Sequence, residues 1–187
     1  MLVTLLTPAV KSTVARGSEY AARDHVGEIR PDHLFAAVLE DADGRRLLGG
    51  QALTEDALRQ VFGDLETSRR KGGLSAAEES ALAGLGIDLD TVVGQIEDRL
   101  GTQALAGGQQ LRPRWWHKPV LSQESVRILA EAERHLSAAG GRSLGVEHLC
   151  LALVSAPSAL AESLARRGVS ETSVRAAMSQ RAGSGSR

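Results

Sequence analysis

The chain has 187 residues, of which 42% are hydrophobic, 24% are charged and only 3% are aromatic. Its formal net charge of −1 gives no overall attraction to nucleic acid or to an anionic membrane. Its single cysteine, Cys150, excludes an intrachain disulfide bond.

The sequence also lacks the apolar segments that direct a chain into or across a membrane. No apolar run approaches the roughly 20 residues that a transmembrane helix needs. The apolar start MLVTLLTPAV is short and lacks the basic region of a signal peptide. Because a lone cysteine also suits a reducing compartment, we expect a cytoplasmic protein that does not enter the membrane.

The composition predicts an all-α fold, because Ala and Leu are abundant and β-branched residues are few. The first helix begins in TPAVKSTVARGSEYAARD, with Thr7 as the expected N-cap and Pro8 at the first helical position. A second helix follows in RPDHLFAAVL, with Pro31 at its start and Asp32 in its first turn. This second helix is apolar almost all round, which predicts that it is buried.

Three segments share one pattern at the entrance to a helix. An apolar residue precedes a Thr, Ser or Asp cap, and a second apolar residue follows five positions after the first, which is the spacing of a hydrophobic staple. The pattern occurs in residues 52–62, 86–96 and 168–178. The middle occurrence indicates an extra helical segment, residues 63–101, that repeats a closing helix.

The chain matches itself when it is shifted by 115 residues, so that His33 falls on His148 and Leu34 on Leu149. The segment LSQESVRILAEAERHLSAAGG, with Ser122 as its cap, then corresponds to the first helix, and GVEHLCLALV corresponds to RPDHLFAAVL. Apolar residues match apolar residues throughout, which is typical of an internal duplication. The prediction is therefore two tandem four-helix units.

The predicted units divide the chain into four parts. The first unit with its extension takes residues 1–101, and the second unit takes residues 121–180. Between them, residues 102–120 contain Gly, Gln and Pro and are predicted to form a linker. The final residues 181–187, RAGSGSR, are predicted to be a disordered tail.

These motifs together resemble the Clp repeat domain, the N-terminal domain of Clp-type AAA+ unfoldases, especially of the ClpC kind. LTPAV and LSQES resemble the starts of that family's units, and the two His-Leu segments resemble the starts of its second helices. Pro31 and Val146 stand where the family motif has Thr. The sequence holds no G-x-x-x-x-G-K-[ST] motif and so has no phosphate cradle for ATP. The resemblance implies a free-standing domain of two stacked units related by a pseudo-twofold axis.

The resemblance suggests two acidic residues as ligand-binding candidates, Asp32 and Glu147. In the ClpC-type domain the matching acid helps to bind phosphoarginine on marked substrates. A carboxylate can pair with a guanidinium, and a helix start can receive a phosphate. The alternative is that both acids only complement the dipoles of their helices.

The resemblance also implies a groove between the two units, where peptides bind along the two first helices. The matching residues are Leu6, Val10, Leu121 and Val126. An apolar groove of this kind suits a peptide, although core packing explains the same residues.

No catalytic, metal or cofactor site emerges from the sequence. We expect His33 and His148 to be hydrogen-bonded packing residues near helix starts. His148 and Cys150 are two positions apart, so on a helix they point to nearly opposite sides and cannot form a nucleophile pair. The remaining histidines are too scattered for a zinc site.

The expected function is therefore non-enzymatic binding of protein substrates or peptides. The chain would modulate Clp proteolysis, with a ClpC-type unfoldase or its adaptors as partners, or it would sequester a peptide ligand. The alternative is a helical DNA-binding regulator, suggested by RPRWWHKP at 112–119, which combines two Trp with basic residues. The second basic segment, SRRKGG at 68–73, is expected to be a solvated loop.

Overall fold

The computed structural model describes residues 5–49, 52–74, 76–101 and 118–184, and these residues form an all-α fold with four two-residue strands. The first half and its extension comprise β1 (Leu5–Leu6), α1 (Pro8–Arg23), β2 (Glu28–Ile29), α2 (Pro31–Glu40), α3 (Ala42–Leu47), α4 (Glu55–Arg70), α5 (Ala76–Gly84) and α6 (Leu89–Leu100). The second half comprises β3 (Val120–Leu121), α7 (Gln123–Ala138), β4 (Ser143–Leu144), α8 (Val146–Ser155), α9 (Ala159–Ala165) and α10 (Glu171–Ser184). The prediction of an all-α fold is confirmed.

The helices begin where local capping chemistry satisfies their first backbone N–H groups. The Thr7 hydroxyl accepts a hydrogen bond from the backbone N–H of Val10 at 3.4 Å, and the Ser122 hydroxyl accepts one from Ser125 at 3.2 Å. Asp88 likewise caps α6 through its carboxylate. These caps are the ones that the sequence predicts.

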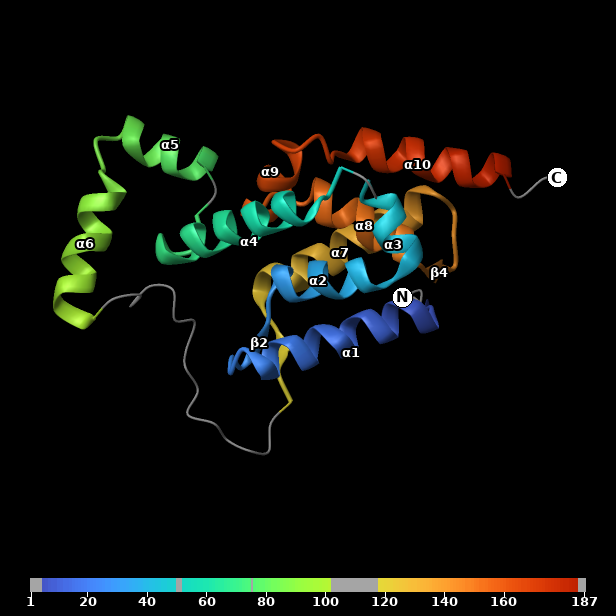
Figure 1. The fold of residues 1–187 in the computed structure, drawn as a ribbon, viewed down its shortest axis with the longest axis horizontal. Coiled ribbons are helices and arrows are strands. Elements are labelled where there is room, and N and C mark those ends of the chain that lie inside the picture. The colour runs from blue at the N-terminus through green and yellow to red at the C-terminus, as the bar shows by residue number, and fades with distance from the viewer. Residues whose placement is uncertain (1–4, 50–51, 75, 102–117, 185–187) are drawn as a thin grey trace.

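The order of elements in the second half repeats that of the first, and the strands pair across the two halves. β1 pairs in parallel with β4, and β2 pairs in parallel with β3. Each strand leads directly into a helix, so every pair brings the starts of two helices from different halves together. The two pairs lie at opposite ends of the helical body, as the positions of β2 and β4 show (Figure 1).

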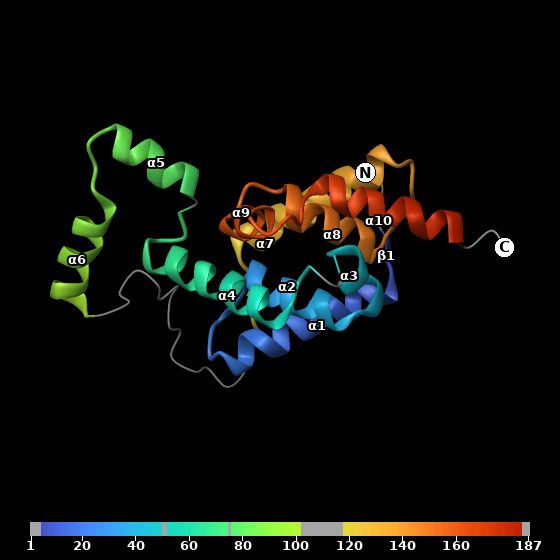
Figure 2. The same ribbon diagram turned by 45° about the horizontal axis from the view of Figure 1, so that its top comes forward.

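The two halves share the larger of the two hydrophobic clusters among the described residues, whereas the sequence suggested a buried centre for each unit. A single cluster joins Phe35 and Val38 of α2 to Leu149 and Leu153 of α8. Two helices pack on the opposite half of the chain. α4 of the first half packs on α9, and α10 of the second half packs on α3 as well as on α8. The interleaving of the warm- and cool-coloured helices is visible in Figure 2.

α5 and α6 form an extension that projects from the body beyond the end of α4 (Figures 1 and 2). This is the extra helical segment that the sequence predicts between the units. At the other end of the chain, α10 continues to Ser184, so the predicted tail is wrong for residues 181–184, and residues 185–187 lie outside the described part. Of the predicted linker, residues 102–117 are also outside the description, and Val120 belongs to β3.

Candidate binding cleft between the starts of α2 and α7

The pairing of β2 with β3 sets two helix starts side by side. Ile29 lies opposite Leu121, so the next residues along each strand lead into α2 and α7 together. The backbone N–H of Ser122 donates to the Ile29 carbonyl at 3.0 Å, and the Ser125 hydroxyl donates to the same oxygen at 2.7 Å. Two positive helix ends therefore face one region of the surface.

A cleft of about 330 Å³ lies at this junction. α2 and α7 form two of its sides, and the end of α4 with its following turn forms another. Its lining includes three arginines and three acids: Glu28, Arg30, Asp32, Arg69, Glu124 and Arg127. The three positive and three negative side chains balance, so the cleft has no formal excess of either charge.

Asp32 and Arg69 form an ion pair inside this cleft. Arg69 Nη1 lies 2.7 Å from Asp32 Oδ2. The Asp32 side chain is only 11% exposed, and the Arg69 side chain is 32% exposed. Charge-assisted contacts of this kind are stronger than neutral hydrogen bonds, so Arg69 holds the end of α4 against the start of α2.

Arg30 and Arg127 are the two remaining cations of the cleft. Neither side chain has a hydrogen bond or ion pair with another residue in the described part of the chain. Burial raises the pKa of the nearby Glu124 carboxyl, and the charge of Asp32 adds to this effect, while Arg127 opposes it. The unpaired guanidinium groups and the two helix starts suit an anionic ligand group.

Glu147, the second predicted acid, lies away from this cleft. It stands in the first turn of α8, after β4, at the end of the body opposite to β2 (Figure 1). Its Oε1 lies 3.4 Å from His148 Nδ1, and its side chain is 33% exposed. The structure therefore does not bring Asp32 and Glu147 together, and no described arginine pairs with Glu147.

The four residues of the predicted peptide groove are not gathered in one place. Val10 is fully buried in the core, while Val126 is half-exposed on α7. Leu6 lies in β1 and Leu121 lies in β3, which belong to the two separate strand pairs. α1 and α7 pack mainly on α2 and α8 rather than on each other, so the predicted groove is not found at these residues.

The two histidines of the repeated motif have the structural role that the sequence predicts. His33 Nδ1 accepts a hydrogen bond from the backbone N–H of Arg30 at 3.0 Å, and His148 Nδ1 accepts one from Gly145 at 3.1 Å. Because Nδ1 is the acceptor, Nε2 of neutral His33 carries the proton and donates to Asp24 at 3.1 Å. Each histidine thus satisfies a backbone donor at a helix start.

The basic segment 68–73 does not form the solvated loop that the sequence suggested. Ser68, Arg69 and Arg70 belong to α4. Arg70 pairs with Glu97 at 3.1 Å, and Lys71 pairs with both Glu79 and Asp90. Sequence reasoning missed Arg69 as a cleft residue, because its partner Asp32 is 37 positions away. Most of the other basic segment, residues 112–117 of RPRWWHKP, lies outside the described part.

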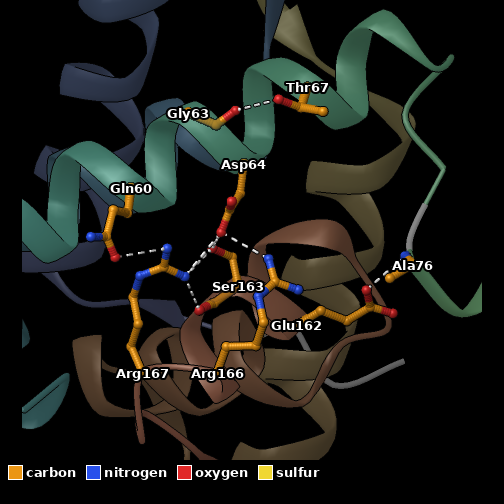
Figure 3. Close-up of polar contacts among 9 residues, drawn as sticks. All are labelled: Gln60, Gly63, Asp64, Thr67, Ala76, Glu162, Ser163, Arg166 and Arg167. Carbon is orange, nitrogen blue, oxygen red and sulfur yellow. Dashed lines mark hydrogen bonds and ion pairs between the residues drawn. The ribbon is translucent and has the colours of Figure 1, made fainter.

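A second polar cluster fixes α4, and with it Arg69, against α9 (Figure 3). Asp64 Oδ2 accepts hydrogen bonds from Ser163 at 2.6 Å, Arg166 at 2.8 Å and Arg167 at 2.9 Å. Burial works to raise the pKa of Asp64, but these three hydrogen bonds outweigh it and lower the pKa. Asp64 therefore joins the two halves through a carboxylate that prefers to be charged.

The described residues show no group of three metal-ligating side chains. Burial raises the pKa of the Cys150 thiol far above its usual range, so this group is not poised as a nucleophile. No single described helix has the length and apolarity to cross a bilayer, and only α8 and α9, bent by 91° between them, meet those criteria as a pair.

Comparison with known proteins shows a likeness of fold alone. No protein-family profile matches the sequence, and no curated protein matches it. Among solved structures 28 chains match. One comes from work described as "Preliminary structural investigations of a malarial protein secretion system". It is 16% identical, with a TM-score of 0.58, over 94% of this chain and 93% of that one.

Proposed function

We propose that this chain is a non-enzymatic binding module for protein or peptide ligands, as its resemblance to Clp repeat domains implies. The cleft between the starts of α2 and α7 is the proposed binding site. In a cytoplasmic setting the module would modulate Clp proteolysis, with a ClpC-type unfoldase or its adaptors as partners, or would sequester a peptide. The fold likeness to a chain from a protein secretion system agrees with a role in handling protein chains.

The observation that carries this proposal is the contact between Asp32 and Arg69. The carboxylate of Asp32 already holds a guanidinium at 2.7 Å within a cleft. A ligand arginine can offer the same group to the same carboxylate. Arg30 and Arg127 line the same cleft and supply cations for a negative group on that ligand.

Phosphoarginine combines both chemical groups, because it carries a phosphoryl group on a guanidinium. In the proposed complex Asp32 receives the guanidinium, while Arg30, Arg127 and the helix starts receive the phosphoryl oxygens. The ligand guanidinium competes with Arg69 for Asp32. Glu147 has no equivalent arginine beside it, so we assign the stronger site to Asp32.

Calorimetric titration of the full chain with free phosphoarginine tests this assignment. We expect saturable binding that weakens at least tenfold in both Asp32→Asn and Arg127→Gln. Glu147→Ala is the matched control and keeps the affinity within about twofold. Absence of binding, or equal binding by Asp32→Asn and the unaltered chain, would overturn the assignment.

A separate measurement tests the proposed partners. The full chain is mixed with the purified Clp unfoldase of its host, and the complex is sought by analytical ultracentrifugation. A complex that Asp32→Asn weakens supports adaptor action through this cleft. If no complex forms while phosphoarginine still binds, the sequestering role is favoured over the adaptor role.

A further inference from the structure

The α5–α6 extension carries an apolar surface that the body of the protein does not cover. None of the nine residues of α5 is buried, and Val93 is the only buried residue of α6. Four large apolar residues of the segment are exposed, with exposed fractions of 77%, 41%, 39% and 76% for Leu85, Ile87, Val92 and Leu100 respectively. We call these four residues the α5–α6 apolar face.

Polar contacts at one side hold the extension to the body. Lys71 pairs with Glu79 and Asp90, Arg70 pairs with Glu97, and the Ser68 hydroxyl donates to the Leu74 carbonyl at 2.7 Å. The two apolar clusters found among the described residues include no side chain of α5 or α6. Helices of 9 and 12 residues are marginal without tertiary packing, so the extension gains stability from any partner that covers its apolar residues.

The charge of the segment determines what kind of partner fits. Residues 74–100 carry six acids, which are Glu78, Glu79, Asp88, Asp90, Glu97 and Asp98, against one basic residue, Arg99 in the last turn of α6. Lys71 pairs with Glu79 and Asp90, and Arg70 pairs with Glu97, so these three acids face the end of α4. A second copy would place acid against acid, and an anionic membrane or a nucleic acid would be repelled.

From this combination we propose that the α5–α6 apolar face binds a basic amphipathic helix of a partner protein. The apolar stripe of that helix covers Leu85, Ile87, Val92 and Leu100, and its Lys or Arg residues face the acids of the segment. This site is separate from the cleft at Asp32. The chain thus has two binding surfaces, a polar one for a small charged group and an apolar one for a helix.

The probe is a synthetic amphipathic helix with leucines along one face and lysines along the other, measured by fluorescence anisotropy at about 0.15 M salt. A peptide with glutamates in place of the lysines is its control. We expect the lysine peptide to bind at least tenfold more tightly than the glutamate peptide. Hydrogen exchange of the complex should show new protection confined to residues 76–100.

Single substitutions separate apolar docking from attraction to acidic residues alone. Leu85→Ser and Leu100→Ser should each weaken binding of the lysine peptide at least fivefold. Val126→Ser removes a half-exposed apolar residue elsewhere on the surface and should leave binding unchanged. Circular dichroism of each variant checks that the helical content is retained.

Three results would overturn the proposal. The first is equal binding of both peptides, and the second is binding by Leu85→Ser and Leu100→Ser that matches the unaltered chain. The third is self-association of the unaltered chain that Leu85→Ser abolishes, which would assign the face to a second copy. Phosphoarginine binding at Asp32 is measured separately. Either binding proposal can therefore be rejected while the other stands.

Discussion

Arg69 of α4 lies 2.7 Å from Asp32 of α2, and this ion pair closes one side of the cleft between the two halves. The two residues are separated by 37 positions in the chain. Since α4 also packs on α9 of the second half, the contact depends on the interleaving of the two halves. The same carboxylate is the group that we propose for ligand binding.

Arg69→Ala should strengthen the binding of phosphoarginine about threefold to tenfold, because the ligand no longer displaces an internal guanidinium from Asp32. Calorimetric titration of the variant beside the unaltered chain measures the change. Arg59→Ala is a matched control, because Arg59 is also on α4 but pairs with Asp56 on the exposed surface. A weaker affinity in Arg69→Ala would show that Arg69 contacts the phosphoryl group instead.

Asp64→Asn should destabilise the fold by about 2 kcal/mol at pH 7, because three charge-assisted hydrogen bonds depend on this carboxylate. The pKa of Asp64 is lowered in the folded state from an ordinary value of 3.8. Its contribution is therefore complete above about pH 4 and is lost as the pH falls through the lower folded-state pKa. Urea unfolding at pH 7 and at pH 3 measures both effects.

The control for Asp64 is Asp56→Asn, which removes an exposed pair on the same helix. Such surface pairs contribute less than about 1 kcal/mol, so this variant should unfold close to the unaltered chain at either pH. If Asp64→Asn lost the same free energy at pH 3 as at pH 7, the proposed charge dependence would be incorrect.

Gly44→Ala should lower the free energy of unfolding by about 1–3 kcal/mol, the usual cost of overpacking. A Cβ at position 44 would lie 2.5 Å from the Val38 carbonyl oxygen and 2.7 Å from Val38 Cγ1. Because the backbone of α2 is part of this contact, it cannot be relieved by a side-chain rotation alone. Thermal and urea unfolding monitored by circular dichroism test the effect.

Gly63→Ala provides the opposite expectation for the same chemical change. A Cβ at position 63 meets nothing within 4 Å, and the residue lies inside α4. Alanine is favoured over glycine in a helix by about 1 kcal/mol. This variant should therefore be slightly more stable than the unaltered chain, and a loss of stability would point to a contact that the geometry does not contain.

Cys150 should resist alkylation by iodoacetamide in the folded protein. Its side chain is fully buried, and burial raises the pKa of the thiol, so reactive thiolate is scarce. The thiol should react completely once urea unfolds the chain, which mass spectrometry detects. Rapid modification under native conditions would mean that the junction of α8 with α3 opens locally, since Cys150 contacts the Gly44 carbonyl at 3.8 Å.

The sequence was most informative where the cause of a structure is local. Thr7, Ser122 and Asp88 begin helices because their side-chain oxygens reach N–H groups two or three positions ahead. Likewise, the histidines of the repeated motif were expected to be structural, and each accepts a hydrogen bond from a backbone group three positions earlier. The all-α class and the extra helical segment follow from composition and periodicity in the same way.

The parts that only the tertiary structure decided depend on partners far apart in the chain. The resemblance to Clp repeat domains suggested Val10 as a groove residue, whereas Val10 of α1 is fully buried in the core. The sequence shows which face of a helix is apolar, but not what covers that face. Arg69 looked like part of a solvated basic loop, because nothing in its neighbourhood reveals an acid 37 positions away. The pairing of β2 with β3 brings the starts of α2 and α7 together, and hydrogen bonding between such distant segments has no local sequence signal.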